Sequence, residues 1–101
     1  MYVGKPERTI RYEEDVQKKL RPYLRRYEKL GELILAIEYV LKRNPEDEET
    51  VPIGENYPNN RSITRLPQEE LDIPLPKIQF LYEYTEDEVV IWAVRIEDAS
   101  S

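Results

Sequence analysis

The chain has 101 residues, a formal net charge of −6, and neither cysteine nor histidine. Its length is typical of one domain, and its 40% hydrophobic content can supply one core. The absence of cysteine excludes disulfides and thiol nucleophiles, while the absence of histidine excludes imidazole bases, Ser-His-Asp triads and the usual zinc sites. Any catalytic side chain within these 101 residues would therefore have to be a carboxylate, lysine, arginine, tyrosine or hydroxyl group.

The charge is unevenly distributed. Residues 1–29 carry nine basic and five acidic side chains, whereas residues 30–101 carry six basic and sixteen acidic ones. The acidic total disfavours non-specific nucleic-acid binding, and the basic first segment fits either a solvated helix face or a local basic partner surface. No apolar run approaches the roughly 18 residues of a membrane span, and the start lacks a signal-peptide pattern. We therefore expect a cytoplasmic protein without membrane contact.

The first third predicts a short strand followed by a helix. Thr9, Ile10 and Tyr12 favour an extended strand over residues 7–12, and the acidic residues 13–15 suit a helix start. The apolar residues that follow share one helical face: Val16, Leu20, Tyr23, Leu24 and Tyr27. Because proline lacks a backbone N–H, we expect the helix to break or restart at Pro22.

A second helix is the strongest local signal. Its apolar stripe consists of Leu30, Leu33, Ile34, Ile37 and Leu41. Leu35, Ala36 and Val40 widen the stripe and predict a well-buried helix, which Asn44-Pro45 should end. The polar residues 46–60 predict a mobile connection pinned by Val51 and Ile53. A strand is predicted over residues 61–66, and prolines 67, 74 and 76 bracket an irregular stretch.

The last third predicts a hairpin with strands at 77–84 and 89–96, and a tail that frays from residue 97. Phe80, Tyr82 and Tyr84 share one face of the first strand, and core packing explains these tyrosines best. In the second strand, strict alternation places Ile91, Ala93 and Arg95 on one face. The predicted class is α+β: a short strand, two helices and a three-strand antiparallel sheet. Two helices on one sheet face would leave the other bare, with Leu81, Ile91 and Ala93 on it as partner contacts.

The order of elements and several segments resemble the RelE/ParE superfamily, the toxins of bacterial type II toxin–antitoxin pairs. The segments concerned are 10–14 (IRYEE), 34–45 (ILAIEYVLKRNP), 78–84 (IQFLYEY) and 89–94 (VVIWAV). The resemblance implies one RelE/ParE-like domain over residues 1–101 and a partner that is an antitoxin-like peptide or protein. It implies metal-free cleavage of messenger RNA at the ribosome, or inhibition of DNA gyrase. Where the family often has an arginine in the third strand, this chain has Gln79, which can hydrogen-bond a phosphate but carries no charge.

Candidate site residues come from the cations of the predicted sheet. Arg65, Arg95 and Gln79 are the predicted catalytic group, since cations at strand ends would lie near the family's active surface and stabilise a phosphorane. Four further residues are predicted to bind a partner or phosphate: Arg61, Lys77, Leu81 and Ile91. The competing interpretation is that the arginines and Lys77 only solubilise and protect the sheet edges. The acidic residues 46–49 lack the spacing of a calcium loop, so no metal or cofactor is predicted.

Three functions remain open from the sequence. The first is a toxin-like component of a toxin–antitoxin pair that blocks translation, cleaves RNA or inhibits gyrase. The second is a non-catalytic protein-binding module on the same scaffold, favoured by Gln79, the lack of histidine and the acidic balance. The third is homodimerisation through the bare sheet face.

Overall fold

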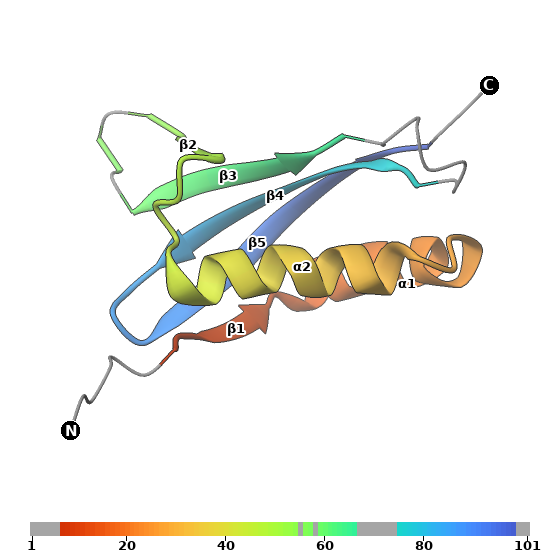
Figure 1. The fold of residues 1–101 in the computed structure, drawn as a ribbon, viewed down its shortest axis with the longest axis horizontal. Coiled ribbons are helices and arrows are strands. Elements are labelled where there is room, and N and C mark those ends of the chain that lie inside the picture. The colour runs from red at the N-terminus through yellow and green to blue at the C-terminus, as the bar shows by residue number, and fades with distance from the viewer. Residues whose placement is uncertain (1–6, 55, 58, 67–74, 99–101) are drawn as a thin grey trace.

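Seven elements make up the computed structural model, which describes residues 7–54, 56–57, 59–66 and 75–98. In chain order they are β1 (Thr9–Tyr12), α1 (Glu14–Arg26), α2 (Leu30–Arg43), β2 (Thr50–Pro52), β3 (Asn60–Arg65), β4 (Lys77–Tyr84) and β5 (Glu88–Glu97). The strands form one sheet in the order β1-β5-β4-β3-β2, in which β1 runs parallel to β5 and the other pairs are antiparallel. Both helices lie on one side of the sheet (Figure 1). The α+β class is therefore confirmed, but the sheet is mixed and five-stranded, not three-stranded and antiparallel.

The helix α1 continues through Pro22, so the predicted break at this residue is wrong. Pro22 is exposed, and the Lys18 carbonyl that loses its helical partner can be solvated there. Val16 and Leu20 carry the contact of this helix with the core, at 3% and 5% exposure. Leu24, predicted to share their face, is 41% exposed.

The helix α2 buries a single stripe. Leu30, Ile34, Ile37 and Leu41 are buried, whereas Leu35 is 65% exposed and Ala36 is also exposed. The prediction that these last two residues widen the buried face was therefore wrong. Because α2 packs on only one side of a single sheet, only one stripe of its surface can be covered (Figure 1).

The core consists of the buried side chains of the two helices and of the β4 and β5 side chains that face them. Phe80 and Tyr82 are fully buried and Tyr84 is 9% exposed, which confirms that this row packs in the core. The Tyr12 ring of β1 meets Phe80 edge-on, with centroids 6.0 Å apart. Such edge contacts are a favourable arrangement of two aromatic rings.

A bulge in β5 changes which residues face the core. Leu81 lies opposite Ala93 and Tyr82 lies opposite Ile91, so Trp92 is an extra residue in β5. Ile91 and Val94 are both buried, and the two residues between them both leave the core face. The prediction that Ile91 lies on the bare face is therefore wrong, because the bulge interrupts the two-residue period of the strand.

The connection between α2 and β3 contains a strand that the sequence did not predict, since residues 50–52 form the edge strand β2. The buried Thr50 holds it in place: its hydroxyl donates to the Asp47 carbonyl oxygen over 2.6 Å. Val51, predicted to pin this segment, is 60% exposed. Ile53 is half-buried, and its backbone N–H donates to the Asn60 carbonyl oxygen over 2.9 Å.

Two predicted irregular segments fall mainly outside the described residues: the stretch after Pro67 and the last three residues of the tail. Within the described part, Glu97 still belongs to β5. Asp98 accepts hydrogen bonds from the Tyr27 hydroxyl and from Arg26, each over 2.7 Å. The prediction that the tail frays from residue 97 was therefore wrong for these two residues, because α1 and the residue after it bind Asp98.

Candidate functional site

The predicted cationic patch is divided between the two faces of the sheet. Gln79 lies directly opposite Arg95, and Lys77 follows two residues away on the same face. Arg61 and Arg65 lie opposite Tyr82 and Ile78, on the face that the helices cover. The residue of β3 directly opposite Gln79 is Thr64, which carries no charge. The five polar residues of the prediction therefore do not form one cluster.

The two arginines of β3 contact the segment that precedes them. Arg61 donates from Nε to the Thr50 hydroxyl over 2.9 Å and from Nη2 to the Thr50 carbonyl oxygen over 3.2 Å. Arg65 forms an ion pair with Glu49. Both cations thus fasten β2 and the acidic residues before it to the sheet, and Glu49 neutralises the charge of Arg65.

The strand tyrosines fasten the same segment. The Tyr82 hydroxyl donates to the Pro45 carbonyl oxygen, and the Tyr84 hydroxyl donates to the Glu46 carboxylate. Burial raises the pKa of Tyr82, and burial followed by the hydrogen bond to Glu46 raises the pKa of Tyr84 to about 12. Both phenols therefore stay protonated at neutral pH and act as hydrogen-bond donors to residues 45–46, not as proton acceptors.

The opposite face of the sheet forms a first candidate surface, here called the open sheet face, and no described helix covers it (Figure 1). Its centre is apolar, since Leu81, Val90 and Ala93 are half-buried and Trp92 is 40% exposed. The predicted site residues Gln79, Arg95, Lys77 and Leu81 all belong to this face. The predicted contact residue Ile91 does not, because it is fully buried in the core.

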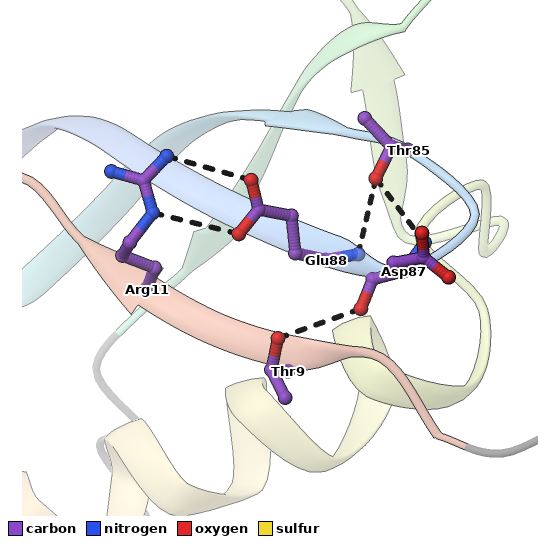
Figure 2. A network of polar contacts seen from close by, with 5 residues as sticks. All are labelled: Thr9, Arg11, Thr85, Asp87 and Glu88. Atoms are coloured by element: carbon purple, nitrogen blue, oxygen red, sulfur yellow. Dashed lines mark hydrogen bonds and ion pairs between the residues drawn. The ribbon is translucent and has the colours of Figure 1, made fainter.

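A polar network fixes one end of the open sheet face (Figure 2). The Thr85 hydroxyl accepts from the backbone N–H groups of Asp87 and Glu88, over 3.2 and 3.1 Å, and closes the turn between β4 and β5. The Thr9 hydroxyl donates to the Asp87 carbonyl oxygen, and Arg11 forms an ion pair with Glu88 at 3.5 Å. These contacts hold β1 parallel to β5 at the edge of the sheet.

A second candidate surface, which the sequence patterns did not reveal, runs along β1. Two adjoining hollows of about 680 and 300 Å³ share Ile10 and Glu38 in their linings. The larger one lies between β1, α1 and α2, with an apolar wall that includes Leu24 and Leu35. The smaller one continues past Thr9 to Lys42. We call the two together the β1 groove.

Some polar side chains of the β1 groove have a hydrogen-bond partner within the chain, and others have no ion-pair partner among the described residues. The Tyr12 hydroxyl donates to the Glu38 carboxylate over 2.5 Å, and burial, followed by this hydrogen bond, raises the pKa of Tyr12 well above its ordinary value. Arg21 lines one hollow and Lys42 the other, and neither forms an ion pair within the described residues. The groove thus combines an apolar wall with two available cations.

The sequence holds no sufficient signal for this groove. Leu24 and Leu35 lie off the most buried positions of their helices, and both are large apolar residues exposed to solvent. Neither residue alone is unusual on a protein surface. Only the packing of α1 beside α2 shows that both line the same hollow.

Comparison with known proteins finds no matching family model, curated protein or solved structure. No helix within residues 7–54, 56–57, 59–66 and 75–98 is long and apolar enough to cross a membrane. Among the same residues, no group of three or more carboxylate side chains could hold a metal ion. The features of the described residues that bear on function are therefore the open sheet face and the β1 groove.

Proposed function

We propose that this chain is a protein-binding domain that takes up an extended peptide segment of a partner in the β1 groove. The observation that carries the proposal is that an unpaired strand edge borders an apolar groove. The strand β1 pairs with β5 on one side, and no other strand among residues 7–54, 56–57, 59–66 and 75–98 pairs with its second edge. Peptides recognised by strand addition gain affinity from main-chain hydrogen bonds and specificity from pockets for alternate side chains.

The backbone of β1 supports this mode of binding. The N–H groups of Thr9 and Glu13 donate to β5, to the carbonyl oxygens of Asp87 and Ile91. In a parallel pair, residues of the opposite parity turn their backbone groups outward, so Ile10 presents an N–H and a carbonyl oxygen at the free edge. The carbonyl oxygen of Tyr12 instead accepts from the Gln17 side chain over 3.0 Å. Docking would therefore centre on Ile10.

The lining of the groove defines the chemistry of the partner. An added strand directs every second side chain to the same face, where the apolar wall with Leu24 and Leu35 favours an aliphatic or aromatic residue. Arg21 and Lys42 favour a carboxylate in the same segment. The expected partner segment is thus extended, acidic and apolar at alternate positions.

A synthetic peptide tests this proposal directly. We expect a fluorescent peptide of alternating leucine and glutamate to bind the full chain in fluorescence polarisation, and the peptide with lysine in place of glutamate to bind at least about tenfold more weakly. Leu35→Glu should abolish binding, because it removes part of the apolar wall and sets a like charge against the glutamates of the peptide. Val51→Glu is the matched control, since Val51 is similarly exposed at 60% but belongs to β2. Equal affinity of both variants for the acidic peptide contradicts the proposal.

A second candidate function is a toxin-like component of a type II toxin–antitoxin pair, with the antitoxin as the bound peptide. The order of one strand, two helices and then the remaining strands supports it. So does the pairing of Gln79 with Arg95 beside Lys77, since this group lies on an uncovered face and could donate to a phosphate. Because Arg65 lies on the other face, the RNA-cleaving version of this hypothesis depends on Arg95 and not on Arg65.

Expression without a partner tests the toxin hypothesis. Bacterial growth should stop, Arg95→Ala should restore it, and Arg65→Ala should not. Loss of intact messenger RNA would indicate cleavage, and loss of DNA supercoiling would indicate gyrase inhibition. Normal growth with abundant protein would remove the toxin hypothesis, while the peptide experiment would still decide the binding function.

A further inference from the structure

The open sheet face has a charge pattern that complements itself. Two of its charged pairs are neutralised within the chain: Arg11 with Glu88 at 3.5 Å, and Lys77 with Glu97 at 4.0 Å. Glu83 and Arg95 are both exposed, and neither forms an ion pair or side-chain hydrogen bond with any other described residue. One uncompensated anion and one uncompensated cation therefore remain on this face.

The register places these two charges symmetrically about the apolar centre. Leu81 lies opposite Ala93, Glu83 lies opposite Val90, and Gln79 lies opposite Arg95. Glu83 and Arg95 thus lie two residues beyond Leu81 in opposite directions along the strands. This distance is about 7 Å on each side.

We propose that a second copy of this chain packs on the open sheet face, with a two-fold axis that crosses the strands at Leu81. Such an axis exchanges the two ends of the face, so Glu83 of each copy faces Arg95 of the other. Packed sheets lie about 10 Å apart and neighbouring strands about 4.8 Å apart, a separation that an arginine and a glutamate side chain together can span. The interface is then closed and isologous, with the same surface on both copies.

The charges distinguish this arrangement from the other face-to-face dimer. A two-fold axis along the strands would set Glu83 against Glu83 and Arg95 against Arg95, which is unfavourable for both pairs. The apolar centre fits either arrangement. Trp92, Leu81 and Val90 would lose solvent exposure on pairing, and the wide aromatic ring of Trp92 supplies the kind of anchor typical of interface centres.

A charge-swap experiment tests this dimer on the full chain. Sedimentation velocity up to roughly 100 μM should show the wild-type chain as a dimer. Glu83→Arg and Arg95→Glu should each weaken self-association at least about tenfold, because each places like charges across the interface. An equimolar mixture of the two variants should form a heterodimer again, since every contact in it joins an arginine to a glutamate. Fluorescence of Trp92, the one tryptophan of the chain, should shift to shorter wavelength in parallel.

Three results overturn the proposal: a monomeric wild-type chain, single variants that associate as the wild type does, or a mixture that stays monomeric. Both residues are exposed, and an unchanged thermal unfolding midpoint for each variant in dilute samples shows that its fold is intact. Leu35→Glu lies in the β1 groove and should leave self-association unchanged. The dimer can therefore fail while peptide binding stands, and the reverse also holds.

Discussion

The two faces of the sheet differ although the same strands build both. Along β4, the helix-covered row of Phe80 and Tyr82 is fully buried, while Leu81, which lies between them, belongs to the open sheet face. Two packed helices make the first row a core, and no described element covers the second (Figure 1). Of side chains adjacent in sequence, one thus contributes to the core and the next to an exposed surface. Single substitutions can therefore distinguish effects on stability from effects on association.

The cations of the two faces show the same contrast. On the covered side, Arg61 donates hydrogen bonds to Thr50 and Arg65 forms an ion pair with Glu49. Both arginines thereby hold β2 and the residue before it against the sheet. On the open side, Arg95 has no such partner among the described residues. A charge that is already paired in the chain contributes to local structure, whereas an exposed unpaired charge is available to a ligand or partner.

The largest difference between the faces should come from truncation of the core. We expect Phe80→Ala to lower the free energy of unfolding by about 3–5 kcal/mol, because it leaves a cavity beneath both helices. Leu81→Ala, one residue further on the open side, should cost less than about 1.5 kcal/mol, since its side chain is only half-buried. Urea unfolding at neutral pH measures both values. Similar costs for the two variants would contradict the assignment of the faces.

The second-largest effect should be a loss of stability at alkaline pH, caused by the tyrosines of the covered face. Folding raises the pKa of Tyr84 from 10.0 to about 12, through burial first and then Glu46, and burial raises the pKa of Tyr12 and Tyr82. The folded chain therefore holds these protons more tightly than the unfolded chain. The resulting stabilisation is complete below about pH 10 and decreases as the pH rises through 12. Urea unfolding across this interval measures the loss, and Tyr84→Phe should reduce its slope; an unchanged slope contradicts the contribution of Tyr84.

Removal of one buried hydroxyl should lower the free energy of unfolding by a moderate amount. Tyr82→Phe deletes the hydrogen bond to the Pro45 carbonyl oxygen and should cost about 1–2 kcal/mol of stability. Tyr39→Phe is the matched control: Tyr39 is 57% exposed, and phenylalanine keeps the ring against the Arg43 guanidinium. The control should change stability by less than about 0.5 kcal/mol. Equal losses would show that Tyr82 does not fasten this segment.

The smallest expected effect concerns the arginines. Arg65→Ala removes a partly exposed ion pair with Glu49 and should cost about 0.2–1 kcal/mol. Arg95→Ala should leave the stability of the monomer within about 0.5 kcal/mol. Thermal unfolding of dilute samples measures both without the contribution of self-association. A greater loss for Arg95→Ala would show that this residue supports the fold and would weaken its assignment to an interface.

Several elements could be predicted from the chain because their signals are local. The stripe of α2 and the alternation of Phe80, Tyr82 and Tyr84 depend only on the periods of helix and strand. The turn before β5 and the end of α2 before Pro45 follow from the residues at those positions. These signals led to the α+β class, to the order of the main elements, and to the placement of Leu81 and Ala93 on the uncovered face.

Strand pairing and surface hollows were decided by tertiary contacts. The short strand β2 pairs with β3, and a hydrogen bond from the Arg61 side chain of β3 to the Thr50 hydroxyl of β2 stabilises this pairing. Ile91 faces the core because a bulge at Trp92 shifts the alternation of β5. The division of the predicted cationic patch follows from the register of β3 against β4, in which Arg65 lies opposite Ile78. Register depends on partners distant in sequence, and a single apolar residue within β3, Ile63, is too short a hydrophobic pattern to specify it.

The sequence by itself thus determined the two helices, the four strands other than β2 and most of the core side chains, since backbone period and burial are linked within each segment. The tertiary structure alone decided the parallel place of β1, its free edge and the groove beside it. These features arise when α1, α2 and β1, joined only by short connections, pack against one sheet. The physical reason is that a groove and a free edge are properties of several elements together, and no single segment encodes them.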